Sequence, residues 1–163
     1  MEQNQQLFSS IKPIGVIRSP HREPAGTPIQ PAFAAKAVGE AVVDGEYASS
    51  LRDLDGFSRI WLIYWFHLAA PYKPLVIPFR DTIERGLFST RAPTRPNPIG
   101  LSAVRLLGVE GNVLKLADID IVDGTPLLDI KPYSPKFDCF PDERSGWLDK
   151  DARDAGTGDD RFA

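Results

Sequence analysis

Short apolar runs alternate with clusters of glycine, proline, aspartate and asparagine along most of the chain. This spacing is typical of an antiparallel β-rich domain and differs from the alternating strands and long helices of a βαβ fold. Strands are expected at 15–19 and 39–44. The pattern therefore predicts a mainly β fold, namely a single β-barrel-like domain with one or two short helices.

A helix is expected directly after the second of these strands. Asp44 can cap a helix whose apolar residues Tyr47, Leu51 and Leu54 share one face. The next run, 59–69, is apolar at both parities and is about half as long as a membrane span. We expect it to be a core strand buried on both faces, against the barrel interior and against a helix or a partner subunit.

A β-hairpin is indicated within residues 101–122, where Gly111 and Asn112 separate two alternating runs. Both residue types can adopt the positive φ angles that a tight turn demands. If the second strand stays regular, its period of two places Asp118 and Asp120 on the same face. The hairpin thus predicts two neighbouring carboxylates.

Length and composition indicate a single domain followed by a polar tail. We place the domain at 1–140 and the tail at 141–163, with no second domain, since 163 residues suffice for one ordinary core. Cys139 is the only cysteine and no signal peptide is recognisable, which favours a reducing, cytoplasmic location. The net charge is −3, yet 71–105 carries six Lys or Arg against two acidic residues, which leaves room for a local basic face.

Familiar catalytic and nucleotide motifs are missing. The sequence has no GxxxxGK[ST] loop, and its two histidines, His21 and His67, stand in no repeated metal-ligand spacing. We expect no metal site, although the aspartates leave weak binding of a hard cation open. The proline-rich stretch RAPTRPNPIGLS (91–102) remains, together with the aspartates and the aromatic strand. Its prolines fix the backbone, and its arginines suit carboxylate or phosphate, or acidic neighbours within the protein.

The stretches GLFSTRAPTRPNPIGLS (86–102) and LADIDIVDGTPLLDIKPYSP (116–135) resemble the signature of the TsaA-like family, also called tRNA methyltransferase O. The likeness extends back through IGVIRSP, QPAFA and FSRIWLIYWFH, and it covers about 11–138. It implies a small β-barrel homodimer that binds S-adenosylmethionine outside the Rossmann class. It also implies methylation of the exocyclic nitrogen of threonylcarbamoyl-adenosine beside the anticodon of tRNA, with no metal and no membrane involved.

The matched motifs imply which residues contact S-adenosylmethionine: Pro31, Ala32, Phe33, His67, Leu68, Arg91, Leu101, Ala117, Asp118, Ile119 and Asp120. An arginine suits the methionine carboxylate, and an aspartate suits a ribose hydroxyl or the adenine amino group. Substrate binding is expected from Arg95, Asn97 and Arg161. Arg95 is the candidate for the threonyl carboxylate once Arg91 serves the cofactor.

The chain departs from the family pattern at Ala32, where glycine is frequent, and at Thr94, where an aromatic residue is common. Long members of the family carry a second C-terminal domain. In this sequence only the tail after about Tyr133 occupies the corresponding position. The DDRF stretch (159–162) resembles an Asp-x-Arg element of that domain. We expect the tail to fold over the site, with its terminal arginine neutralising charge and its aromatic residue excluding water.

Methyl transfer from a sulfonium depends mainly on positioning, but a delocalised nitrogen lone pair calls for a base within reach. Asp120 and Asp123 are the candidate bases, and the sequence does not choose between them. Two other functions stay open. One is a module that binds S-adenosylmethionine or a nucleoside without catalysis, which suits the acidic total charge. The other is a metal-dependent hydrolase built on Asp118 and Asp120.

Overall fold

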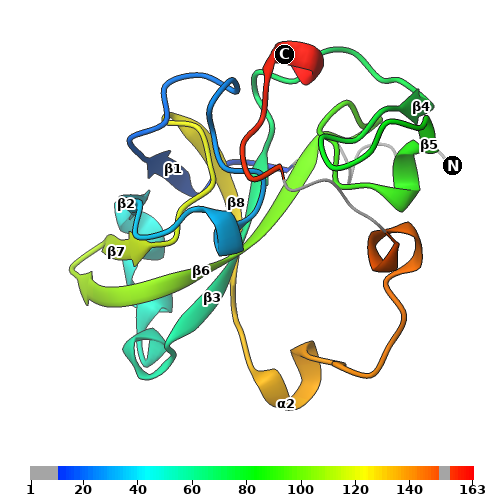
Figure 1. The fold of residues 1–163 in the computed structure, drawn as a ribbon. Coiled ribbons are helices and arrows are strands. Elements are labelled where there is room, and N and C mark those ends of the chain that lie inside the picture. The colour runs from blue at the N-terminus through cyan, green and yellow to red at the C-terminus, as the bar shows by residue number, and fades with distance from the viewer. Residues whose placement is uncertain (1–10, 151–154) are drawn as a thin grey trace, which may run out of the picture.

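Six antiparallel strands close into a barrel in the spatial order β1-β2-β7-β6-β3-β8 (Figure 1). The structure is a computed structural model that describes residues 11–150 and 155–163. The barrel strands are β1 (Gly15–Arg18), β2 (Val38–Val43), β3 (Arg59–Trp65), β6 (Ile99–Glu110), β7 (Val113–Ala117) and β8 (Thr125–Pro132). A separate small sheet pairs β4 (Leu75–Val76) with β5 (Arg85–Gly86), and α2 (Pro135–Asp138) follows the barrel. The predicted mainly β, barrel-like fold is confirmed.

The barrel core is made by alternate residues of each strand. In β3, Ile60, Leu62 and Tyr64 are buried, whereas the residues between them are only half-buried. The outer face of β3 is therefore not fully covered by the part of the chain that the structure describes, and the expectation of two buried faces is met only in part. Trp61 on this face packs edge-on against Tyr133, with ring centroids 5.6 Å apart.

The helix expected after the second strand is replaced by two short 3₁₀ helices, Gly45–Leu51 and Leu54–Gly56. Asp44 makes no side-chain capping bond, contrary to the prediction. Asp53 lies between the two helices with a φ of 66°, in the left-handed region that no right-handed helix can pass through. The break at this residue explains why one continuous α-helix does not form.

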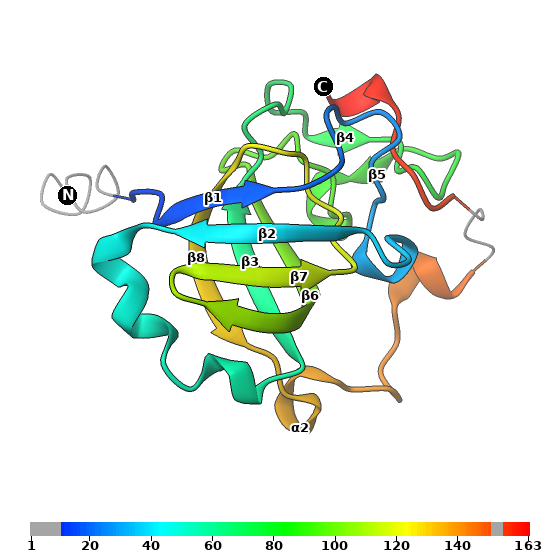
Figure 2. The same ribbon diagram turned by 90° about the vertical axis from the view of Figure 1, so that its left-hand side faces the viewer.

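The predicted hairpin between β6 and β7 is present, and Figure 2 shows it beside β2. Gly111 is the first residue of the two-residue turn and has a φ of 63°. Two-residue hairpin turns require a positive φ at this position, which glycine adopts readily. The second strand, however, ends at Ala117, because Asp118 adopts a φ of 59°. The prediction that Asp118 and Asp120 project side by side from a regular strand is therefore wrong.

Residues 155–163 return to the body of the protein near β4 (Figures 1 and 2). The Gly158 carbonyl accepts a hydrogen bond from the Gly26 amide at 2.9 Å, and the Phe162 carbonyl accepts one from the Ala70 amide at 2.9 Å. The Phe162 ring is 6% exposed and meets Phe79 edge-on at 5.0 Å. This aromatic contact belongs to a second, smaller core cluster, whose other members are Val76, Leu87 and Ala92.

Among the residues that the structure describes, no helix combines the length and apolar character that crossing a membrane requires.

The burial of Phe162 leads to a prediction about stability. Phe162→Ala removes the ring from the second core cluster, so we expect a loss of about 3 kcal/mol and a fall in Tm of roughly 6 to 12 °C. Phe140→Ala is the matched control, since Phe140 is 69% exposed and its loss is expected to change stability by no more than about 0.5 kcal/mol. Thermal unfolding followed by circular dichroism measures both. Equal Tm values for the two variants would contradict a structural role for the terminal segment.

Candidate functional site

A cavity of about 780 Å³ opens at one end of the barrel. Its walls come from the ends of β3 and β6, the segment that joins β7 to β8, the loop around Phe33 and the proline-rich stretch 91–102. Residues 158–162 close one side. The lining is mostly apolar, with a few polar groups directed into it, as is usual for small-molecule sites.

Two arginines of the proline-rich stretch line this cavity. Arg91 donates from Nη1 to the Gln30 side-chain oxygen at 2.6 Å. Arg95 donates from Nη1 to the carbonyl oxygens of Thr90 and Ala92, at 3.1 and 3.3 Å. Neither arginine forms an ion pair with a carboxylate of the described part of the chain. The stretch thus presents two positive charges to the cavity on a backbone that proline restrains.

Asp120 contributes the carboxylate of the cavity. Its Oδ1 atom is buried and has no hydrogen-bond partner among residues 11–150 and 155–163. Burial raises the pKa of this carboxyl to about 7, while the Ser102 hydroxyl and the positive charge of Arg91 act in the opposite direction. A carboxyl with such a pKa exchanges protons near neutral pH, which is the property of a general base.

A buried pair of hydroxyls lies beside Asp120. Tyr64 Oη and Ser102 Oγ are 3.0 Å apart, and both residues are almost completely buried. Burial, followed by the charge of Asp120, raises the pKa of Tyr64, so its phenol stays protonated. Gly100 allows the tyrosine ring to sit here, because a Cβ on Gly100 would come within 2.2 Å of the ring. The floor of the cavity is therefore polar but uncharged next to Asp120.

His67 and Thr125 meet on another wall of the cavity. Thr125 Oγ1 lies 3.3 Å from His67 Nδ1 and donates to the Val122 carbonyl oxygen at 2.6 Å. Burial lowers the pKa of His67 below its usual value. The imidazole is therefore neutral at physiological pH, and it adds no positive charge to the two arginines.

Asp118 lies outside the cavity lining and is engaged elsewhere. Its carboxylate accepts hydrogen bonds from Arg59 Nη2 at 2.8 Å and from Arg105 Nη2 at 3.1 Å. These bonds, that of Arg105 first, lower the pKa of Asp118 and keep it ionised. The side chain is 10% exposed, so its two guanidinium partners leave little room for a ligand.

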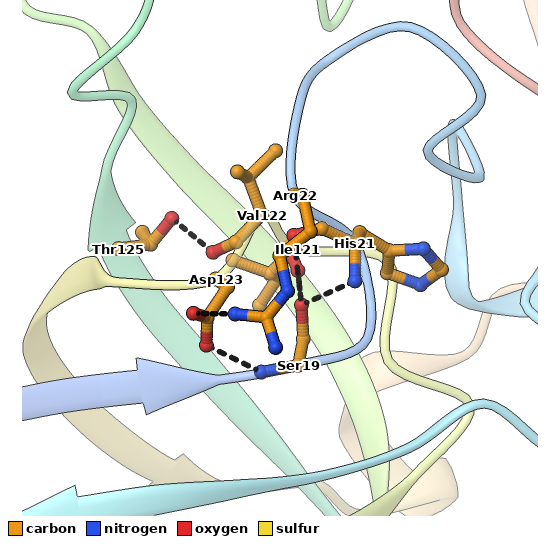
Figure 3. Close-up of polar contacts among 7 residues, drawn as sticks. All are labelled: Ser19, His21, Arg22, Ile121, Val122, Asp123 and Thr125. Atoms are coloured by element: carbon orange, nitrogen blue, oxygen red, sulfur yellow. Dashed lines mark hydrogen bonds and ion pairs between the residues drawn. The ribbon is translucent and has the colours of Figure 1, made fainter.

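Asp123, the other candidate base, is not among the residues that line this cavity. Figure 3 shows its polar contacts. Its carboxylate accepts from the Ser19 amide at 3.0 Å and pairs with Arg22. Ser19 Oγ in turn donates to the Ile121 carbonyl oxygen at 2.5 Å. These bonds tie the segment between β7 and β8 to the loop after β1, and Asp123 lines a second, smaller pocket of about 440 Å³ that shares no lining residue with the cavity of Asp120.

The structure brings together part of the predicted set. Those that line the cavity are Phe33, His67, Leu68, Arg91, Arg95, Leu101 and Asp120. Those outside its lining are Pro31, Ala32, Asn97, Ala117, Asp118, Ile119, Asp123 and Arg161. Pro31 and Ala32 belong to the same short 3₁₀ helix as Phe33, so that loop still reaches the cavity.

Arg161 has its own partners. Its guanidinium donates to the carboxylate of Asp159, from Nη2 at 2.6 Å, and lies over the Phe79 ring at 4.8 Å. It also donates to the carbonyl oxygens of Ile77 and Pro78. The expected terminal cation is thus compensated and does not line the cavity, whereas Gly158, Asp159 and Phe162 of the same segment do.

Several lining residues were missed by sequence reasoning, namely Tyr64, Ile121, Val122, Thr125 and Trp147. The first of these lies on the expected aromatic strand, but only the register shows that it faces the cavity. Ile121, Val122 and Thr125 lie within the five residues after Asp120, where the signature continues as IVDGT. The continuing motif could therefore have pointed to these residues. A regular strand through this segment, as the sequence predicted, gave no reason to expect them at a binding site.

No cluster of three or more histidine, cysteine or acidic side chains that could hold a metal ion occurs among residues 11–150 and 155–163. A metal-dependent hydrolase built on Asp118 and Asp120 would need both carboxylates to face one ion. Asp118 is paired with Arg59 and Arg105, whereas Asp120 faces the cavity.

Comparison with known proteins places this geometry in a family. A sequence profile of the tRNA-methyltransferase O N-terminal domain matches residues 16–139. An S-adenosyl-L-methionine-binding protein of Archaeoglobus fulgidus is 45% identical over 129 residues, covering 79% of this chain and 92% of that protein. The tRNA (adenine(37)-N6)-methyltransferase of Escherichia coli is 40% identical over 144 residues, covering 82% of this chain and 61% of that enzyme.

The solved structures agree with the sequence match. TrmO from Pseudomonas aeruginosa superposes with a TM-score of 0.71 at 41% identity, covering 84% of this chain and 61% of that chain. This chain therefore spans about three fifths of the length of the E. coli and P. aeruginosa proteins. Because the profile match takes in most of the barrel strands and the segments that carry Arg91 and Asp120, the chain belongs to the tRNA-methyltransferase O family.

Proposed function

We propose that the protein is an S-adenosylmethionine-dependent methyltransferase that acts on the N6 nitrogen of adenosine 37 in tRNA, beside the anticodon. The name of the E. coli relative supports the reaction and its position. Threonylcarbamoyl-adenosine is the finer substrate that we propose at this position. The cationic wall of the cavity supports it, because the threonyl group carries a carboxylate that needs a positive partner.

The observation that carries the proposal is the buried carboxyl of Asp120 in an otherwise mostly apolar cavity. The N6 lone pair of a carbamoylated adenine is delocalised, so losing the N6 proton makes the nitrogen a far better nucleophile. Asp120 would accept that proton as the nitrogen gains a methyl group. Of the two candidate bases it is the one that faces the cavity, which favours it over Asp123.

The residues of the cavity also suit the cofactor. Arg91 has no carboxylate partner in the described chain and would pair with the methionine carboxylate, while Phe33 and Leu101 offer apolar surface to the rest of the molecule. When bound, S-adenosylmethionine supplies an electrophilic methyl group on a sulfonium. Arg95 remains for the threonyl carboxylate, and the neutral His67 avoids adding a further charge near the sulfonium.

A second function has specific support. The A. fulgidus relative, of which this chain covers 92%, is named as an S-adenosyl-L-methionine-binding protein without an activity. A module that binds this ligand without catalysis would use the same cavity but would leave tRNA unchanged. Mass analysis of nucleosides from tRNA treated with the protein and S-adenosylmethionine decides between the two, since a methylated product appears only for the enzyme.

Arg91→Ala is expected to weaken S-adenosylmethionine binding by roughly tenfold or more, because the ligand carboxylate loses a charge-assisted hydrogen bond. Binding raises Tm by mass action, so the ligand-induced shift should largely disappear in the variant. Arg52→Ala, an exposed arginine outside the cavity, is the matched control. Unchanged binding by the Arg91 variant would remove the proline-rich stretch from the cofactor site.

The pKa of Asp120 predicts the pH dependence of methylation. As a base it works when deprotonated, so the single-turnover rate should rise as the pH passes through about 7 and level off above that value. Asp120→Asn should lower the plateau by roughly 10²-fold to 10⁴-fold and abolish this dependence. Asp129→Asn is the control, since its half-exposed carboxylate lies outside the cavity and pairs with Lys131. A full rate in the Asp120 variant would exclude this residue as the base.

We propose a homodimer, using the outer face of β3 and β6 beside the cavity. Ile63 pairs in register with Leu101, and Trp65 with Ile99, which creates an apolar patch across the two strands. Leu101 is 47% exposed, so the patch is incompletely covered by the chain itself. Light scattering should give twice the chain mass of 18.0 kDa, and Ile63→Glu should return it to one chain mass. A wild-type monomer at micromolar concentration would contradict the dimer.

A further inference from the structure

An exposed aromatic residue stands beside the cavity. Phe88 lies in the 3₁₀ helix Leu87–Ser89, between β5 and the proline-rich stretch, and it lines the cavity. It is 76% exposed, although a phenylalanine at a surface ordinarily turns inward when it can. Its neighbour Leu87 is buried in the second core cluster and fixes this short helix in place.

An arginine lies over the ring of Phe88. The Arg95 guanidinium carbon is 5.5 Å from the ring centroid. Its two hydrogen bonds to backbone carbonyls of the same loop hold the guanidinium plane in position. No carboxylate of the described residues pairs with it, so its charge remains available to a ligand.

A second pair of the same kind adjoins the first. Trp147 donates from Nε1 to the Ser89 carbonyl oxygen at 2.8 Å, which attaches the indole to the turn that carries Phe88. The Arg85 guanidinium carbon lies 5.5 Å from the Trp147 ring centroid, and its Nε donates to Asp81 at 2.7 Å. Trp147 also lines the cavity. Two aromatic faces and two guanidinium planes are therefore held together by the segment 85–95.

We propose that the pairs Phe88–Arg95 and Trp147–Arg85 form a stacking platform for unpaired bases of an RNA loop whose target nucleotide enters the cavity. This inference rests on the proposed function, because the platform adjoins the cavity in which the target base would react. It assigns RNA-loop binding to side chains outside the expected substrate set, apart from Arg95.

The chemistry of the platform favours an unpaired RNA loop over a paired stem. Unstacked bases offer planar faces to aromatic rings and guanidinium groups, whereas the bases of a duplex are already stacked on one another. The negative charge of the RNA, which includes the threonyl carboxylate of the target nucleotide, suits the positive charge of Arg95. A chain with a net charge of −3 has little general attraction for RNA, so a local platform of this kind answers how such a protein could hold it.

Binding of a synthetic anticodon stem-loop RNA, followed by fluorescence anisotropy, tests the platform. Phe88→Ala should weaken binding about tenfold, while Phe88→Tyr, which keeps the ring, should bind like the wild type. Phe137→Ala is the matched control, because Phe137 is 64% exposed on α2 and lies outside the cavity lining. Its affinity should equal that of the wild type.

Salt dependence separates stacking from charge. Phe88→Ala should lower the affinity at every salt concentration and leave the slope of log K against log salt unchanged. Arg95→Ala should also reduce that slope, because one positive charge that faces the RNA is lost, whereas Arg52→Ala should leave it as in the wild type. A fully paired RNA duplex should bind weakly to the wild type and show no difference between the wild type and Phe88→Ala.

Three results would overturn the platform. The first is stem-loop affinity unchanged by Phe88→Ala. The second is an equal loss of affinity for stem-loop and duplex. The third is a change of oligomeric state on Phe88→Ala, which would make this face a contact between copies of the chain. If the wild type methylates tRNA and any of these three results is obtained, the platform is rejected and the proposed function is retained. Tight stem-loop binding without methylation would instead reject the activity and keep the platform.

Discussion

The ion pairs of Asp118 with Arg59 and Arg105 hold the backbone at the point where the barrel gives way to the site. Asp118 has a φ of 59°, a conformation that costs a residue with a side chain roughly 1 to 2 kcal/mol. Guanidinium groups from β6, which pairs with β7, and from β3, which pairs with β6, both bind the carboxylate at this turn. Without the turn β7 would continue as a strand, and Asp120 would not be directed into the cavity.

A second set of bonds fixes the other end of the same segment. Asp123 is held by the Ser19 amide and by Arg22, and Ser19 Oγ binds the Ile121 carbonyl oxygen (Figure 3). The segment between β7 and β8 is thus anchored on both sides of Asp120, which itself lacks a partner for Oδ1. Three aspartates close in sequence therefore differ in environment: Asp118 and Asp123 pair with arginines, and Asp120 lines the cavity.

Features that depend on neighbouring residues could be predicted from the sequence, whereas features that depend on contacts between distant residues could not. The strands and the β6–β7 turn were predicted, because alternation and a glycine at the turn are local signals. The course after Ala117 was not, since the left-handed turn at Asp118 depends on Arg59 and Arg105, which are distant in sequence. The motif comparison pointed to this segment, of which Asp120, Ile121 and Val122 line the cavity, whereas Ala117 and Ile119 do not.

The buried carboxyl of Asp120 also sets a cost for the whole fold. Its pKa is about 7 in the folded chain and near the ordinary 3.8 when unfolded, so the folded state binds the proton more tightly. Between about pH 4 and pH 7 the folded state therefore holds more protons, and this group's contribution to stability falls as the pH rises. At neutral pH and above, the rest of the barrel must offset the cost of a buried, unpaired carboxylate. Selection for stability alone would favour an asparagine or an apolar residue there, so the stability cost of this carboxyl is what a role in the proposed reaction would account for.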